Sequence, residues 1–346
     1  MSVPEKEKSM LEQIKKVAPG TAMRTVIADL LRSDLGAIIA FETPEIEKVI
    51  EGGFRVNCRF TPQRLFELCK MDGGIVISAD MRRILYANVL FTPDATITTN
   101  ETGTRHKAAE KTAKQLNTLV VTISERRKKT TLYYGCSKYY LRSTEEVFRE
   151  ITNTIQLLEK QREIFDDLTN KIGLLEITNM VSVSDICKII QRSEIILRNS
   201  ETLKKDFIEV GKEGTLMNLR FKELLKGVEK KEGELIRDYA KLSLKKTKIL
   251  LENLSFDGLI EIESIARLIF EKELEDIVSP RGYRFMSQLN ISEKDAFAIV
   301  KEYRSLNEIL NDDTNKMEEI LKSNTIKIKE EIGELREKIA EGRTVL

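Results

Sequence analysis

Short apolar runs alternate with amphipathic stretches over the first 142 residues. The runs are rich in β-branched and aromatic residues and are bounded by turn residues, which is typical of strands, whereas apolar positions three or four residues apart indicate helices. The pattern therefore predicts an α/β domain over residues 1–142, with a mixed sheet flanked by helices. The expected strands are 36–41, 74–78, 83–90, 118–124 and 130–134, and the expected helices lie near 8–18, 62–70 and 105–116.

From residue 143 the hydrophobic period becomes helical. Ser143 is followed three residues later by Glu146, which predicts a capping box at the start of a helix. Apolar residues then recur at steps of three and four over 148–175, interrupted only by Arg162. This pattern predicts one long helix with a narrow apolar seam, which is more typical of a packing or assembly element than of a catalytic one.

Two further regions complete the expected architecture. No proline lies between residues 94 and 279, so we expect an all-α spine over 143–277. The motif VSPRGYRF then opens a small all-α domain over 278–346, which ends in a charged helix at 327–342. Breaks in the spine are expected at SVSD (182–185), GKEG (211–214) and SFDG (255–258).

Composition and cysteine usage exclude several classes of protein. The chain of 346 residues is 41% hydrophobic and 33% charged, which excludes a disordered or fibrous protein. No stretch free of Asp, Glu, Lys and Arg exceeds ten residues, and the first residues are charged, so we expect neither a membrane span nor a signal peptide. The four cysteines form no C-x-x-C pair, which argues against a disulfide framework or zinc cluster and favours a cytoplasmic protein.

Charge and the histidine count restrict the chemistry. Residues 1–140 carry 22 lysines and arginines against 16 acidic residues, while the remainder carries 35 against 40. A basic N-terminal half suits an anionic ligand. His106 is the single histidine, so a site that needs two imidazole ligands is excluded, and a Ser-His-Asp relay would have to use that residue.

Three segments of the α/β part carry candidate chemistry. In MDGGIVIS (71–78), Asp72 could bind a metal or a hydroxyl and Gly73 would allow close approach of a ligand, although Asp-Gly before a strand is usually a turn. In ISERRKKTT (123–131), Ser124 and Arg127 could reach a terminal phosphate, although such a basic run is usually a solvated hairpin tip.

The third segment, ETGTRHKAAEKTAKQ (101–115), outlines a phosphate cradle. Thr102, Gly103 and Thr104 lie where a helix is expected to begin, so backbone N–H groups, hydroxyls and the positive helix end would converge on an anion. Arg105 and His106, followed by a lysine, add side-chain donors. An N-capped surface helix with a basic face is the alternative. The chain contains no G-x-x-x-x-G-K-[ST] string, so this is not a Walker A loop.

These segments, in their order along the chain, resemble the diadenylate cyclase domain of the bacterial DNA integrity scanning protein family, whose hallmarks are an Asp-Gly-Ala and an Arg-His-Arg triplet. VAPGTAMR (17–24), the EGGF turn (51–54) and SPRGYR (279–284) also resemble that family, so the likeness spans nearly the whole chain. The resemblance implies a condensation of two ATP molecules into cyclic di-AMP, with release of two pyrophosphates. It also implies a homo-oligomer, an octamer in the family, in which two cyclase domains meet face to face.

The resemblance also implies roles for individual residues. Asp72 would bind Mg²⁺ or Mn²⁺ and help activate the 3′-hydroxyl, and Arg105 and His106 would act in catalysis. The nucleotide and its phosphates would be held by Gly73, Phe91, Thr102, Gly103, Thr104, Arg105 and His106, and the terminal phosphate by Ser124 and Arg127.

The sequence departs from the family pattern around the expected site. Gly74 stands where the family has Ala, so we expect a looser backbone and an open pocket. Phe91 stands where leucine is common, and Lys107 stands where the second Arg is expected, which keeps the charge but loses bidentate donation. None of these changes removes a group on which the chemistry depends, and we expect activity.

The C-terminal region departs further. The family's helix-hairpin-helix DNA module would correspond to residues 316–332, with Glu319, Ile320 and Leu321 in place of a Gly-Ile-Gly turn. Residues 286–346 carry ten basic and thirteen acidic residues, so we expect weak binding to branched DNA. The alternative function is a DNA-binding or scaffolding protein whose cyclase domain senses nucleotide without turnover.

Overall fold

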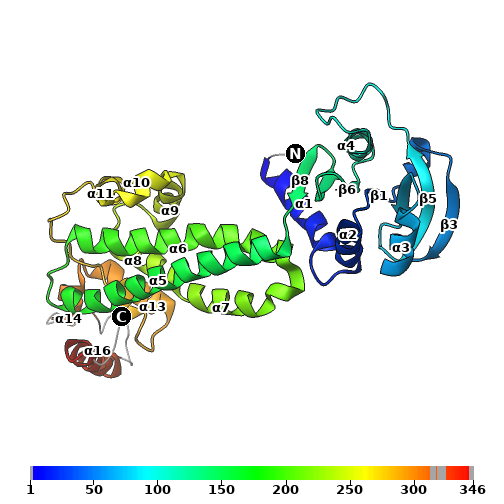
Figure 1. Ribbon diagram of the computed structural model, residues 1–346. Coiled ribbons are helices and arrows are strands. Elements are labelled where there is room, and N and C mark those ends of the chain that lie inside the picture. Colours follow the sequence, from blue (N-terminus) through cyan, green and yellow to red (C-terminus); the bar gives the residue numbers. More distant parts are fainter. Residues whose placement is uncertain (1–2, 312–316, 318–324, 343–346) are drawn as a thin grey trace. The chain divides into compact units, whose positions relative to one another are not determined.

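The computed structural model describes residues 3–311, 317 and 325–342 (Figure 1). The chain divides into two compact units. Unit 1 consists of residues 1–152 and 203–219, and unit 2 of residues 153–202 and 220–346. A mixed sheet with helices forms the N-terminal part and helices form the rest, as the hydrophobic pattern predicts. The three-part division at residues 142 and 277 stays a prediction.

An eight-stranded mixed sheet forms the centre of unit 1. Its order is β2-β5-β4-β1-β6-β7-β8, with β3 paired to β5. β1 and β4 are parallel, whereas the other pairs are antiparallel. The strands are β1 (Ala37–Phe41), β2 (Ile50–Glu51), β3 (Phe54–Arg59), β4 (Gly74–Ile77), β5 (Arg83–Phe91), β6 (Leu119–Ser124), β7 (Lys129–Tyr134) and β8 (Ser137–Leu141).

The five strands expected from the sequence are confirmed, and three further strands were not expected. β2 has only two residues. β3 and β8 are half-exposed and carry polar side chains between their apolar ones, so neither has the continuous apolar run of a buried strand.

Helices cover both faces of the sheet. The helices α1 (Val3–Val17), α2 (Ala22–Arg32) and α3 (Pro62–Cys69) pack on one face, in a buried cluster that includes Ile39 and Ile75. The helix α4 (Thr104–Leu116) packs through Ala109 and Ala113 on the other face (Figure 1). The helix α2, which was not expected, begins at an N-cap in which the Thr21 side chain accepts a hydrogen bond from the Arg24 N–H.

Arg142 attaches residues 203–219 to unit 1. Its guanidinium pairs with Glu209 and Asp206, with Nη2–O distances of 2.5 and 2.6 Å. The side chain of Glu209 also accepts hydrogen bonds from the Tyr139 hydroxyl and the Arg142 backbone N–H. This network ties the last turns of α6 (Val183–Val210) to the end of β8, which explains why residues distant in sequence join the α/β unit.

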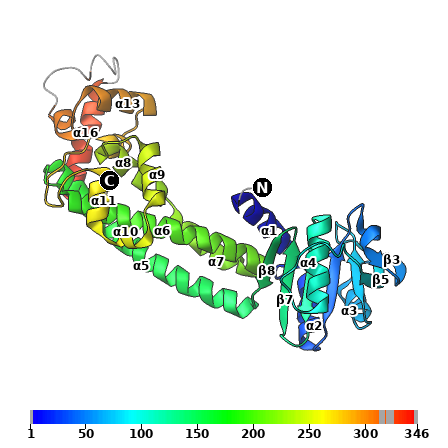
Figure 2. The same ribbon diagram turned by 90° about the horizontal axis from the view of Figure 1, so that it is seen from above.

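The helix α5 (Thr144–Ile177) is the expected long helix. Ser143 Oγ accepts a hydrogen bond from the Glu146 N–H at 3.2 Å, as an N-cap should. In unit 2, α6 runs beside α5 (Figures 1 and 2). Arg162, which interrupts the apolar seam, pairs with Asp166 and donates hydrogen bonds to the carbonyl oxygens of Leu224 and Lys226.

Short helices make up the remainder of the chain. Asp238 accepts hydrogen bonds from the N–H groups of Gly282, Tyr283 and Arg284, which holds the SPRGYR segment onto α8. The helices are α7 (Thr215–Leu225), α8 (Val228–Tyr239), α9 (Leu244–Asn253), α10 (Phe256–Ile260), α11 (Ile262–Ile269), α12 (Tyr283–Met286), α13 (Glu293–Glu302), α14 (Leu306–Leu310) and α16 (Thr325–Ala340), with 3-10 turns at Ile46–Val49 and Gly211–Gly214.

The expected features of the C-terminal region are only partly visible. The charged terminal helix is α16, two residues earlier than expected. Glu319, Ile320 and Leu321, the expected replacement of the hairpin turn, lie outside the described residues. Within the described part of the chain, none of the helices combines the length and the apolar run that crossing a bilayer requires.

Candidate functional site

Three segments meet at one edge of the sheet. The parallel register pairs Ile39 of β1 with Ile75 of β4, so both strands begin at this edge, directly after Gly36 and after Asp72 and Gly73. β6 runs antiparallel to β1, and the pairing of Ala37 with Ile123 places the end of β6 at the same edge. The topology therefore brings the Asp-Gly turn and the end of the Ile-Ser strand together.

The first turn of α4 lies at this edge. Gly103 is the N-cap residue and Thr104 the first helical residue, as the sequence predicts. The N–H groups of a first helical turn have no acceptor within the helix and carry the positive end of its dipole. The Arg105 guanidinium packs on Gly36, where a Cβ atom would lie 2.1 Å from Nη1. A larger residue at position 36 would require the end of the Arg105 side chain to move.

Two adjoining cavities open at the edge. The first has a volume of about 510 Å³ and the second about 450 Å³, and both are lined by His106 and Ser124. Cavities of this size hold small organic ligands. The first is lined by Ile38, Gly73, Gly74, Val89, Leu90, Phe91, Gly103, Thr104, Arg105, His106, Ala108 and Ser124. The second is lined by Glu101, His106, Ser124, Arg127, Lys129, Thr131 and Tyr140.

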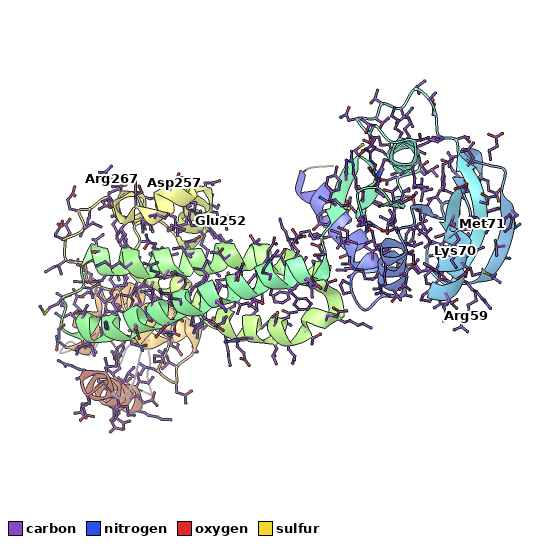
Figure 3. The ribbon with its side chains drawn as sticks, viewed as in Figure 1. Arg59, Lys70, Met71, Glu252, Asp257 and Arg267 are labelled. Carbon is purple, nitrogen blue, oxygen red and sulfur yellow. The ribbon has the colours of Figure 1, made fainter. Side chains whose placement is uncertain are left out.

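The expected site residues gather here with two exceptions. Eight of the ten line one or both cavities, whereas Asp72 and Thr102 are exposed neighbours of lining residues. Asp72 lies in the turn between α3 and β4, directly after Met71, which is labelled in Figure 3. The structure gives their positions, and their roles stay predictions.

The basic run after β6 is the tip of a hairpin, as one of the two interpretations predicts. The Arg127 N–H donates a hydrogen bond to Ser124 Oγ at 3.2 Å, and Lys128 pairs with Asp34 at 2.8 Å. Arg127 nevertheless lines the second cavity. The segment is therefore a hairpin tip and also carries the residue that was expected to bind an anion.

His106 contacts two groups that the sequence did not single out, and one of them is bonded to two further residues. Its Nδ1 lies 2.9 Å from the Tyr133 hydroxyl and 3.1 Å from Thr122 Oγ1. The Tyr133 hydroxyl donates a hydrogen bond to Glu101 Oε1 at 2.9 Å, and Lys138 pairs with the same carboxylate. Glu101 directly precedes the Thr-Gly-Thr string, which is the only sequence signal for any of them. Tyr133 looks like an ordinary inward-facing strand residue.

The acidic residues at this edge limit how a metal could be held. Among residues 3–311, 317 and 325–342, no cluster of three or more His, Cys, Asp or Glu residues could form a metal cage. Asp72 is an exposed carboxylate beside the first cavity. Mg²⁺ is commonly bound by one or two carboxylates together with substrate phosphates and water. The residues present therefore fit a metal that arrives with a phosphate ligand.

Two family descriptions match consecutive parts of the chain. Residues 24–137 match the family described as DisA bacterial checkpoint controller nucleotide-binding, and residues 141–275 match its DisA bacterial checkpoint controller linker region. The DNA integrity scanning protein DisA of Acetivibrio thermocellus is 35% identical over 324 residues, covering 91% of this chain and 90% of the relative. The chain belongs to the DNA integrity scanning protein family.

The chain is also similar to a second member of this family and, at much lower identity, to a solved structure. The DisA of Symbiobacterium thermophilum is 37% identical over 281 residues, which is 80% of each chain. The crystal structure of DacA from Staphylococcus aureus is 18% identical and has a TM-score of 0.30, covering 42% of this chain and 94% of that one.

At position 74 a neighbouring ring occupies the space of the missing methyl, and the looser backbone expected there stays a prediction. A Cβ atom on Gly74 would lie 2.2 Å from Cε2 of Phe91 and 3.2 Å from Cγ2 of Ile38. The Phe91 ring, which is buried, therefore fills the space that the alanine methyl would occupy in the DNA integrity scanning pattern. The two departures from that pattern compensate each other, because the larger side chain at 91 requires the smaller one at 74.

Gly74→Ala is therefore expected to destabilise this family member by about 1–3 kcal/mol, as overpacking does in a filled core. In the Phe91→Leu background the same change should cost much less, because the ring that blocks the methyl is gone. Thermal unfolding of the four proteins of this double-mutant cycle measures the coupling. An equal cost of Gly74→Ala in both backgrounds would contradict the compensation.

Lys107, which stands where the family pattern has a second arginine, lies away from the cavities. Lys107 is exposed, and the residues that line the two cavities do not include it. The loss of bidentate donation expected from lysine in place of arginine therefore falls outside the described cavity walls.

Proposed function

We propose that this chain condenses two ATP molecules into cyclic di-AMP and releases two pyrophosphates. The observation that supports this most is the meeting of three segments at one sheet edge. The Asp-Gly turn, the first turn of α4 and the end of β6 surround two adjoining cavities lined by Arg105, His106 and Arg127. Membership of a family with a nucleotide-binding domain agrees with a nucleotide substrate.

Each group has a separate task in this proposal. The first-turn N–H groups of α4, Arg105 and His106 hold phosphate oxygens, and Ser124 and Arg127 hold the terminal phosphate. The first cavity, with Phe91 in its wall, receives the nucleoside. Asp72 holds Mg²⁺ or Mn²⁺ and helps to activate the 3′-hydroxyl. The metal neutralises charge on the phosphates, and phosphoryl transfer otherwise depends on positioning rather than on a covalent nucleophile.

The proposed reaction requires two copies of the chain. Each protomer holds one ATP, and each 3′-hydroxyl attacks the α-phosphate that the opposite protomer holds, so the two site edges face each other. The active form is therefore a homo-oligomer, with the octamer of the family as the expected state.

Incubation of the purified full chain with ATP and Mn²⁺ tests the proposal, with products identified by mass spectrometry. We expect cyclic di-AMP, with specific activity that falls on dilution as the oligomer dissociates while ATP stays saturating. Absence of the cyclic product, or undiminished turnover by a species shown to be monomeric, would contradict the proposal.

Control of the cyclase by DNA is a separate part of the proposal. Branched DNA would bind through the C-terminal region, where residues 286–346 have a net charge of −3. Because phosphate neutralisation supplies most nonspecific affinity for DNA, this binding should be weak and strongly salt-dependent.

A further inference from the structure

A series of hydrogen bonds, the His106 relay, leads away from the candidate site through His106, Tyr133 and Glu101. It runs from His106 Nδ1 to the Tyr133 hydroxyl at 2.9 Å and from there to Glu101 Oε1 at 2.9 Å. Lys138 of β8 pairs with the same carboxylate and lies over the Tyr133 ring at 5.9 Å. The residues of this hydrogen-bond series come from different elements, since Glu101 precedes α4 and Tyr133 lies on β7.

The hydrogens shared by His106, Tyr133 and Glu101 have one consistent arrangement. Hydrogen bonds from Lys138 and Tyr133, although opposed by burial, lower the pKa of Glu101, so this carboxylate is ionised and can only accept. Burial and the bond to Glu101 raise the pKa of Tyr133, so its hydroxyl keeps its single hydrogen and donates it to Glu101. The Tyr133 oxygen is left as an acceptor, and the hydrogen between it and His106 must come from Nδ1.

The other neighbour of Nδ1 fits the same arrangement. Thr122 Oγ1 lies 3.1 Å from Nδ1, and its own hydrogen is directed to the Thr131 carbonyl oxygen at 3.4 Å. Thr122 therefore serves as a second acceptor for the Nδ1 hydrogen. With Nδ1–H used inside the protein, the other ring nitrogen, Nε2, is left for the cavities that His106 lines.

We propose that Glu101 and Tyr133 are positioning residues that hold His106 as the Nδ1–H tautomer, so that Nε2 binds a proton when a triphosphate enters the cavities. The first part follows from the hydrogen bonds alone, and the second rests on the proposed function. In the bound state Nε2–H donates to a phosphate oxygen, and Nδ1–H is stabilised by Tyr133 and the Glu101 charge behind it. The added proton comes from hydronium or a buffer acid in solvent, whose bond to the proton breaks as the Nε2–H bond forms, and the charge of His106 rises by one.

The surrounding charges make this proton uptake depend on the ligand. Burial lowers the pKa of His106, and the positive charges of Lys138, Arg127 and Arg105 lower it further, while Glu101 opposes them. The imidazole is therefore neutral in the free protein near neutral pH. A triphosphate adds negative charge on the side of Nε2, which favours the imidazolium. The site thus gains a cation only when an anion is present to pair with it.

The single histidine of this chain allows a direct test of the tautomer. In protein labelled with ¹⁵N-histidine, all imidazole signals come from His106, and the ¹⁵N shifts distinguish Nδ1–H from Nε2–H. We expect Nδ1–H in the wild type and a shift of the population toward Nε2–H in Tyr133→Phe, which loses the nearer of the two acceptors and keeps only Thr122. Tyr134→Phe is the matched control, since Tyr134 is the next residue of β7 and packs on the opposite face of the sheet. Nε2–H in the wild type, or an unchanged tautomer in Tyr133→Phe, would overturn the proposal.

Proton uptake on binding tests the second part. Calorimetric titration with a non-hydrolysable ATP analogue, in buffers of different ionisation enthalpy, measures the protons bound per nucleotide. We expect uptake at His106 in the wild type, reduced uptake in Glu101→Gln and affinity about tenfold weaker in that variant, by analogy with the groups that support metal-binding histidines. Equal uptake and affinity in both proteins would overturn the role of Glu101. Failure of the analogue to bind would instead contradict the proposed function, and the tautomer result would stand apart from it.

Discussion

Asp72→Asn should reduce cyclic di-AMP synthesis by about a thousandfold, while the chain still folds and binds nucleotide. In the proposal this carboxylate is the one protein group that holds the metal, and metal charge neutralisation contributes several kcal/mol to such reactions, each ~1.4 kcal/mol being tenfold in rate. Asp72 is exposed, and substitution of an exposed residue usually changes stability by less than about 0.5 kcal/mol. Initial rates at saturating ATP and Mn²⁺, followed by mass spectrometry, measure the loss.

Asp80→Asn provides the matched control for this variant. Asp80 is also exposed and follows the opposite end of β4, where it accepts hydrogen bonds from Ser78 and from the Arg82 N–H. Asparagine can accept the same bonds, so we expect synthesis close to that of the wild type. Nucleotide binding without divalent metal should be equal in all three proteins, because the proposed phosphate donors lie on α4, at the end of β6 and in the hairpin tip that follows it. Comparable rates for Asp72→Asn and Asp80→Asn would remove Asp72 from the mechanism.

Glu176→Gln should destabilise unit 2 by about 3–5 kcal/mol, the usual cost of breaking a buried ion pair. Glu176 Oε1 lies 2.7 Å from Arg284 Nη1 and accepts a hydrogen bond from the Tyr239 hydroxyl at 2.7 Å. The Arg284 side chain is only 2% exposed. Arginine cannot lose its proton in a protein, so the substitution removes the carboxylate that pairs with this buried positive charge. Differential scanning calorimetry of the full chain measures the change.

Two further variants separate the charge effect from a packing effect. Glu176→Gln combined with Arg284→Met removes both charges, and we expect it to recover much of the lost stability, because an apolar replacement of a buried pair is often neutral. Glu334→Gln breaks the exposed pair of Glu334 and Lys338 on α16 and should cost less than about 1 kcal/mol. A loss as large for Glu334→Gln as for Glu176→Gln would show that burial of the pair is not the cause.

Most of the candidate site could be predicted from sequence because its residues lie in short contiguous motifs. The Thr-Gly-Thr-Arg-His string carries its own helix start, so the N-terminal donors of α4 follow from local capping rules. The role of Gly36 could not be predicted in this way. It depends on an arginine almost seventy residues later that packs on its backbone, and no local pattern encodes that contact.

The pair of Gly74 and Phe91 shows a second limit. Considered singly, the missing methyl at Gly74 predicts a looser backbone, and the phenylalanine at position 91 predicts a larger side chain in the cavity wall. The structure pairs Gly74 with Val89 across β4 and β5, which brings the Phe91 ring over the glycine. The side chain that fits at position 74 therefore depends on the residue at position 91. Packing density couples residues that are adjacent in space, and a single sequence does not contain that adjacency.

The sequence alone determined five of the eight strands, the long capped helix and the positions of the candidate phosphate-binding motifs, because hydrophobic period and capping act over a few residues. Only the tertiary structure decided which motifs share an edge of the sheet and which residues stand behind them. Glu101, Tyr133 and His106 come from a loop, a strand and a helix, and a hydrogen bond between such elements forms only after the sheet register and the helix packing have placed its two atoms within about 3 Å.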